Sequence, residues 1–155
     1  MQLPVRLALG NLYGRAGRLE SAIAQFNLWL VDRGDNPHRG DAYFGRCRAR
    51  ALLGRDLSKA LSDCNDAVRL SPKASPRALD TRALVRLRMG EFDKSIADYD
   101  AALSLAPKLA WSLYGRGLDE LHKGMTAAGQ ADIAAATALQ PQLPQEAQRY
   151  GLAPP

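Results

Sequence analysis

Apolar side chains recur along this chain with the spacing of helices, in paired segments separated by short polar turns. In the cleanest stretch, Leu79, Ala83 and Leu87 line one side of a first segment, which is the spacing of an amphipathic helix. A second apolar stripe then runs over residues 92–103. The pattern therefore predicts two consecutive amphipathic helices joined by a short turn.

Glycine and proline mark where these segments end. The turn glycines are Gly17, Gly54, Gly90 and Gly124. The closing prolines, which are 35, 35 and 34 residues apart, are Pro37, Pro72, Pro107 and Pro141. Glycine tolerates the positive φ that commonly ends a helix, and the residue before a proline disfavours the α conformation. A fixed period of this length is typical of repeat architectures.

The chain is thus predicted to be a single all-α domain over residues 1–155, an α-α superhelix (solenoid) of four helical hairpins. The hairpins are expected over residues 3–39, 40–74, 75–108 and 109–142. A short capping helix around residues 144–150 and a loose end should follow. One hairpin has too little core to fold alone, so the repeats should stack.

Small residues recur where the two helices of each hairpin must approach most closely. They are Gly10, Cys47, Ala83 and Gly117 in the first helices, and Ala22, Ala60, Ser95 and Gly129 in the second. A larger side chain there should cost about 1–3 kcal/mol. Truncating Leu57 or Tyr99, which we expect to be buried, should cost about 2–5 kcal/mol.

Arginine and aspartate also recur at matched places, in the first and second helices respectively. The arginines are Arg46, Arg82 and Arg116, and the aspartates are Asp63, Asp98 and Asp132. This pattern predicts charge-assisted bridges between helices, with a structural role favoured over a functional one.

In this register the chain resembles the tetratricopeptide repeat family over residues ~3–143. It departs from the family pattern at Trp29 and Ser95, where alanine is usual, and at Ile133, where an aromatic residue is usual. The resemblance implies a protein-interaction module or scaffold without catalysis. The residues that match the two-carboxylate clamp of chaperone-tail-binding members are Leu7, Asn11, Gly45, Arg77 and Thr81. Because only Asn11 is retained, that subtype is not expected.

The resemblance also implies that the first helices line a concave groove that holds a peptide or a partner helix. The implied groove residues are Asn11, Arg15, Phe44, Arg48, Arg77, Leu84, Arg88, Trp111, Tyr114, Leu118 and His122. Aromatic residues and arginine are frequent interface anchors, so we expect a ligand with apolar anchors and a carboxylate. Two alternatives stay open: a further helix covers this face, or Trp111 simply packs against the third repeat.

Composition narrows the partner class. The net charge of +5 favours an acidic protein or peptide as the partner. The sequence has no run of Lys and Arg residues, which argues against nucleic acid as a partner. A basic RNA-binding solenoid is the weakest alternative. No apolar run is long enough for membrane insertion. The first residues do not form a signal peptide, which favours the cytoplasm unless an export signal was trimmed away.

The sequence contains none of the common catalytic or nucleotide-binding fingerprints. Two cysteines and two histidines do not form a zinc-type ligand set, so no metal and no cofactor are expected. Cys47 and Cys64 should face each other in one hairpin, where a disulfide is conceivable. The favoured interpretation is two buried thiols acting as small apolar side chains. A second functional interpretation is a repeat segment that positions the substrate or partner of a larger, exported enzyme.

Overall fold

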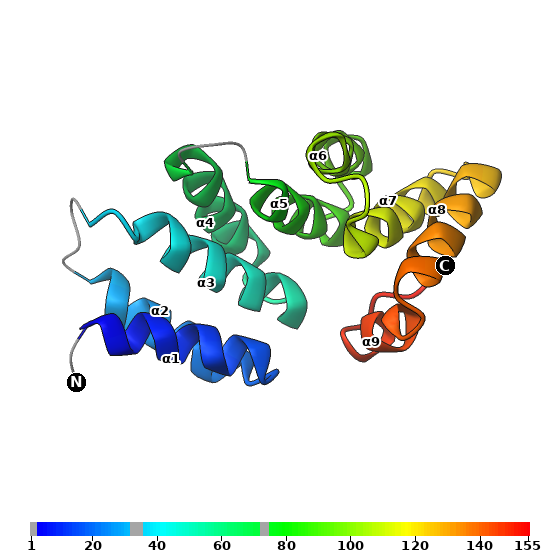
Figure 1. Cartoon of the computed structure of the whole chain (residues 1–155). Helices are drawn as coiled ribbons and strands as arrows, with labels where there is room; N and C mark the ends of the chain where they lie inside the picture. Colours follow the sequence, from blue (N-terminus) through cyan, green and yellow to red (C-terminus); the bar gives the residue numbers. More distant parts are fainter. Residues whose placement is uncertain (1–2, 32–35, 72–74) are drawn as a thin grey trace. The chain divides into compact units, whose positions relative to one another are not determined.

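A computed structural model describes residues 3–31, 36–71 and 75–155, and over these residues the chain is all-α (Figure 1). The helices are α1 (Leu3–Arg15), α2 (Leu19–Leu30), α3 (Arg39–Leu53), α4 (Leu57–Leu70), α5 (Pro76–Arg88), α6 (Phe92–Leu105), α7 (Ala110–His122), α8 (Thr126–Leu139) and α9 (Leu143–Arg149). The helix pairs α1–α2, α3–α4, α5–α6 and α7–α8 confirm the helix–turn–helix repeats, and α9 confirms the capping helix.

The turns between paired helices have the conformation that their glycines predict. The four turn glycines all have positive φ, between 68° and 76°. At the end of α3 the amide of Gly54 donates to the carbonyl oxygens of Arg50 and Ala51, at 2.9 and 3.2 Å. This same turn contains one additional residue, and Asp56 accommodates it with a φ of 52°. These positions explain why each first helix stops where it does.

The chain forms two compact units, one ending at Ala74 and the other beginning at Ser75. In the first unit, α1 packs on α2, α2 on α3 and α3 on α4, and α1 also touches α3. In the second unit, α5 packs on α6, α6 on α7 and α7 on α8, and α5 touches α7. Within each unit, consecutive hairpins therefore stack through their helices.

In each unit one buried aromatic ring packs against a glycine of a neighbouring helix. In the first unit Phe26 of α2 is 1% exposed, and a Cβ atom at Gly45 of α3 or Gly10 of α1 would collide with its ring. In the second unit Tyr99 of α6 is 1% exposed, and a Cβ atom at Gly115 of α7 would collide with its ring. The absence of a side chain at these glycines therefore admits the aromatic ring of a neighbouring helix.

The Gly115→Ala variant should lose about 1–3 kcal/mol of unfolding free energy, because the new methyl group overlaps Tyr99. Gly14→Ala is the matched control: nothing lies within 4 Å of its Cβ position, so alanine there should be neutral or stabilising by up to about 1 kcal/mol. Urea denaturation of the two variants measures both effects. Equal stability would show that the Tyr99 contact is wrongly placed.

The small residues predicted inside the hairpins lie at close approaches. Ala22, Ala60, Ala83 and Ser95 have no exposed surface. In the fourth hairpin, a Cβ atom at Gly117 would lie 2.8 Å from the carbonyl oxygen of Gly129. The predicted packing frame is confirmed at these positions. One core expectation is wrong: Leu57 begins α4 and is only half-buried, so its truncation should cost less than that of Tyr99.

The C-terminal end is not loose throughout, contrary to expectation. After α9 (red in Figure 1) the chain turns at Gly151, whose φ is 70°. Leu152 then returns to the protein and is only 6% exposed, whereas Pro154 and Pro155 are exposed. Leu152 belongs to the same core cluster as Leu143 of α9 and Leu118 of α7. The end of the chain is thus part of the second unit's core.

Candidate functional site

In the first unit, the candidate groove residues lie on α1 and α3. Asn11 and Arg15 of α1 are exposed, and Phe44 and Arg48 of α3 are half-buried. In the part of the chain that the structure describes, neither Arg15 nor Arg48 pairs with a carboxylate. This face therefore combines a half-buried aromatic side chain with two guanidinium groups that are available to an acidic ligand.

In the second unit, the structure brings four of the predicted residues together around one small hollow between α5 and α7. Leu84 of α5 meets Trp111, Tyr114 and Leu118 of α7 there. The other residues that line the hollow are Asp80, Leu87, Tyr99, Gly115 and Leu152. Asp80 accepts a 2.6 Å hydrogen bond from the Ser112 hydroxyl, which ties α5 to α7.

The chain's own C-terminal segment covers this hollow. Tyr114 and Leu118 are each only 2% exposed, because Leu152 packs among them. The Tyr114 hydroxyl donates to the carbonyl oxygen of Leu152 at 3.4 Å, and the Arg88 guanidinium donates to the carbonyl oxygen of Tyr150. Burial lowers the pKa of Arg88. Arg88 therefore holds a main-chain carbonyl of the chain itself.

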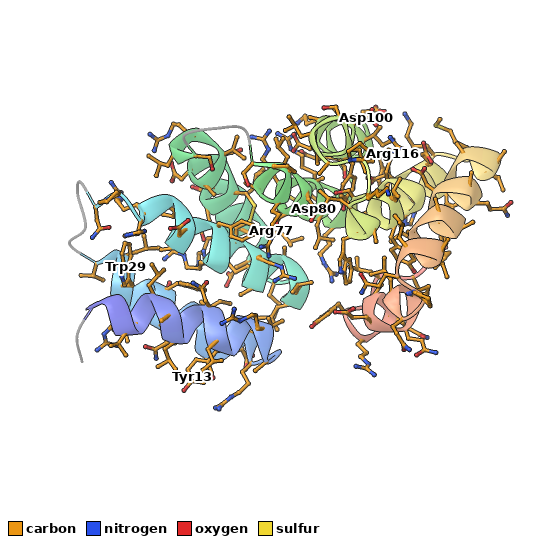
Figure 2. The ribbon with its side chains drawn as sticks, in the orientation of Figure 1. Tyr13, Trp29, Arg77, Asp80, Asp100 and Arg116 are labelled. Carbon is orange, nitrogen blue, oxygen red and sulfur yellow. A yellow bond between two sulfur atoms is a disulfide. The ribbon has the colours of Figure 1, made fainter. Side chains whose placement is uncertain are left out.

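The two remaining predicted residues lie near the ends of their helices. Arg77 is exposed in the first turn of α5 (Figure 2). His122 is exposed at the end of α7, and its ring stacks on Phe92 with centroids 4.9 Å apart and an interplanar angle of 7°. This contact gives His122 a packing partner on α6.

The predicted Arg–Asp bridges are confirmed in three hairpins, each with two hydrogen bonds in parallel. The donor–acceptor distances are 2.8 and 2.6 Å for Arg46–Asp63, 2.8 and 2.7 Å for Arg82–Asp98, and 2.6 and 3.0 Å for Arg116–Asp132. The bridges join the two helices of one hairpin. The hydrogen bonds that Arg82 and Arg116 donate to these carboxylates raise the pKa of both arginines.

Sequence reasoning missed a second arginine in two of these bridges. Arg50 donates to Asp63 at 2.5 Å, and Arg86 donates to Asp98 at 2.8 Å. Both additional arginines lie one helical turn after the first, a spacing that could have revealed them. In α7 that position is Glu120, and Arg116 reaches across to Asp100 of α6 at 2.7 Å instead (Figure 2).

Asp119 of α7 is a buried carboxylate that the sequence analysis did not single out. It has no exposed surface, and neither carboxylate oxygen has a hydrogen-bond partner among the described residues. Burial raises its pKa to about 7, a shift that the nearby Ser95 hydroxyl opposes. That hydroxyl is within reach but donates to the carbonyl oxygen of Ala83 at 2.8 Å. The charged form of Asp119 is therefore poorly solvated in the folded protein.

The Asp119→Val variant should be more stable than the original protein by about 1–3 kcal/mol at pH 8, because an unpaired buried carboxylate is removed. The folded-state pKa lies above the ordinary value of 3.8, so the folded chain binds this proton more tightly than the unfolded chain. The penalty is absent at low pH and develops as the pH rises from about 4 to about 7. Denaturation midpoints at pH 4 and pH 8 measure this; an equal gain at both values would contradict the explanation.

The structure corrects the favoured interpretation of the cysteines. Cys47 of α3 and Cys64 of α4 form a disulfide, with Cα atoms 5.4 Å apart, and both are buried. The two small side chains face each other across the hairpin, as expected, and at this Cα separation a disulfide is geometrically accessible. They are therefore not separate apolar side chains.

Two features are absent from the described residues. No helix among them is both long and apolar enough to cross a membrane. Nor does any group of three or more His, Cys, Asp or Glu side chains in residues 3–31, 36–71 and 75–155 gather as metal ligands would.

Comparison with known proteins shows which sequences and folds this chain is similar to. Residues 76–109 match the tetratricopeptide repeat family, and no curated protein sequence gives a significant match. A crystal structure of MamA is 22% identical, with a TM-score of 0.71 over 93% of this chain and 81% of that one. MamA from Desulfovibrio magneticus is 20% identical, with a TM-score of 0.70 over 96% and 81%.

A tetratricopeptide repeat protein from Parabacteroides merdae is also similar, at 22% identity and a TM-score of 0.68 over 96% of this chain and 61% of that one. The sequence match covers only the third hairpin. The similarity in fold to these solved structures also covers the other hairpins. One hairpin of this chain, residues 76–109, thus matches the tetratricopeptide repeat family, and the glycine turns and paired helices around it have the fold of such repeat proteins.

Proposed function

We propose that this protein is an interaction module that binds a peptide or partner helix on the faces of its first helices, through apolar anchors and a carboxylate. A tetratricopeptide repeat implies a protein partner. The finer proposal is carried by Arg48, which lies one helical turn after Phe44 on α3, and by the exposed Arg15 of α1; neither arginine pairs with a carboxylate among the described residues. Arg46 and Arg50 of α3 both bind Asp63, whereas Arg48 on the same helix has no such partner.

The chemistry of this face suits an acidic segment. A guanidinium group binds a carboxylate through two parallel hydrogen bonds, which gives orientation as well as attraction. Phe44 beside it supplies apolar surface of the kind that anchors interfaces. The net charge of +5 should also speed the approach of an acidic ligand.

A peptide array tests this proposal. Synthetic peptides of varied sequence are made in matched pairs, one with a free C-terminal carboxylate and one amidated, and the intact protein is applied to both. We expect the free acids to bind more strongly, by about tenfold for a carboxylate held by arginine, which corresponds to about 1.4 kcal/mol.

The variant and its control separate binding from folding. Arg15→Ala/Arg48→Ala should abolish the preference for the free acid. Arg69→Ala is the control, because Arg69 of α4 is exposed and pairs with its neighbour Asp66. If the double variant keeps the preference, Arg15 and Arg48 do not bind the carboxylate and this proposal is wrong.

One observation favours the alternative of an exported repeat segment that positions the substrate or partner of a larger enzyme. Disulfides persist mainly in oxidising compartments, and Cys47–Cys64 is a buried disulfide. Acid quenching of the host cells, followed by alkylation of the denatured protein and mass spectrometry, reports the state of both cysteines, which are buried in the folded chain. Fully alkylated cysteines would argue for a reducing compartment and against export.

A further inference from the structure

The C-terminal segment over residues 150–152 is held on α5 and α7 in the manner of a bound peptide. The Arg88 guanidinium donates to the carbonyl oxygen of Tyr150, and the Tyr114 hydroxyl donates to that of Leu152. Between these two bonds the Leu152 side chain enters the hollow, where it is 6% exposed. Its apolar neighbours there are Leu84, Leu87, Trp111 and Leu118.

These contacts define what the hollow recognises. Both hydrogen bonds end on main-chain carbonyl oxygens, so they accept any side chains at those residues. Selectivity comes from the aliphatic side chain in the hollow and from the Tyr150 ring packed against the same cluster. Gly151 between them, whose φ is 70°, forms the turn that ends α9. An L-residue other than glycine rarely adopts that conformation. The matching ligand is an aromatic residue followed by glycine and leucine.

We infer that the hollow between α5 and α7 is a peptide site that the chain fills with its own residues 150–152, and that it binds an aromatic–glycine–leucine segment of a partner when that tail leaves. This inference rests on the proposed function, because it also assigns a face of the first helices to a protein partner. It adds which residues that partner should present. It also makes the tail an intramolecular competitor on the second unit.

The tail is attached in a way that allows exchange. Beyond α9, a single buried side chain, Leu152, anchors it, and residues 153–155 that follow are exposed. Release of the tail breaks the amide hydrogen bonds by which residues 150–152 cap α9, and a partner segment then replaces the two bonds to Arg88 and Tyr114 and the buried leucine. When a competing occupant is present, the apparent affinity for a partner falls by the fraction of molecules whose site is open.

Fluorescence anisotropy with the intact chain tests this inference. The probe is a fluorescein-labelled peptide with the sequence of residues 148–155, and a second probe has aspartate in place of its leucine. Leu152→Asp in the full chain should release the tail, because a carboxylate is disfavoured in an apolar hollow. We expect this variant to bind the first probe at least about tenfold more tightly than the original chain does, and neither protein to bind the aspartate probe.

The controls decide between the possible results. Pro154→Ala, at an exposed position of the same tail, should bind like the original chain, and adding Leu84→Ala to Leu152→Asp should weaken probe binding. If Leu152→Asp loses its cooperative melt, Leu152→Ala serves in its place, with an expected gain of at least about threefold. Equal binding by the original and variant chains, or none by either, would overturn the inference.

Two further outcomes have distinct meanings. If sedimentation shows that the original chain forms a dimer that Leu152→Asp loses, the tail fills a second copy's hollow, and the intramolecular assignment is wrong. If the acid-peptide preference through Arg48 holds while the tail probe fails here, only this inference falls and the proposed function stands.

Discussion

Replacing Asp98 by alanine should lower the free energy of unfolding by about 3–5 kcal/mol, the largest single effect that we expect in this chain. Asp98 accepts hydrogen bonds from both Arg82 and Arg86, and its side chain is only 7% exposed. Each arginine side chain is 19% exposed. Alanine would therefore leave two positive charges close together, mostly shielded from water, and would remove the carboxylate that they share.

Urea denaturation of Asp98→Ala measures this loss, and a surface pair on the same helix supplies the control. Asp100 of α6 pairs with Arg116, but its side chain is 55% exposed, so Asp100→Ala should cost no more than about 1 kcal/mol. A triple change of Asp98, Arg82 and Arg86 to apolar residues of similar size should recover most of the loss. A small effect of Asp98→Ala, equal to that of the control, would show that the bridge is effectively solvated.

Removing the disulfide should have the second largest effect. The Cys47→Ala/Cys64→Ala variant should lose about 2–4 kcal/mol, because the bond closes a short loop and restricts the unfolded chain. The cysteines are 17 residues apart and tie α3 to α4 in the middle of one hairpin. Alanine is chosen because Ala83 occupies the position of Cys47 in the next repeat and is also fully buried, which keeps the packing penalty small.

Denaturation with and without reductant isolates the contribution of the bond. The original chain should unfold at lower urea concentration when reductant is present, whereas the double variant should show one midpoint in both conditions. Thiol titration of the denatured, non-reduced chain should find no free thiol. Two titratable thiols, together with a midpoint that ignores reductant, would return Cys47 and Cys64 to the role of small apolar side chains.

The repeats could be predicted because their signals are local. Glycine at each turn, the Ser75–Pro76 start of α5 and the helical spacing of apolar residues depend on neighbours along the chain. Ser75 indeed accepts a hydrogen bond from the amide of Ala78 at 3.3 Å. The Arg–Asp bridges were predictable for a related reason. The same two residue types recur at matched positions in successive repeats, so a contact that forms in one repeat is expected in the others.

The features that sequence reasoning missed depend on contacts that do not recur from one repeat to the next. Leu152 follows the last repeat, so no second copy of its position exists to reveal that it is buried. A disulfide and a pair of free thiols both require two small side chains that face each other in one hairpin. The sequence pattern is therefore the same in the two cases. Asp119 did carry a signal, since the equivalent positions in α3 and α5 are the buried Ala49 and Val85.

These results change how the groove residues are understood. Sequence reasoning treated all eleven as equivalent contributors to one ligand surface. In the first unit, Arg15 and Arg48 are available to a ligand, whereas in the second Tyr114 and Leu118 are covered by Leu152. We therefore expect the original chain to bind partners first through α1 and α3, and through α5 and α7 only after its tail has left.

The most direct measurement of this account is a map of amide chemical shifts in the intact, isotopically labelled chain, with the strongest free-acid peptide of the array added. The account predicts shifts concentrated on the first helices α1 and α3 around Arg48, which Arg15→Ala/Arg48→Ala removes. Shifts concentrated on the second helices α2 and α4, unaffected by that variant, would contradict it.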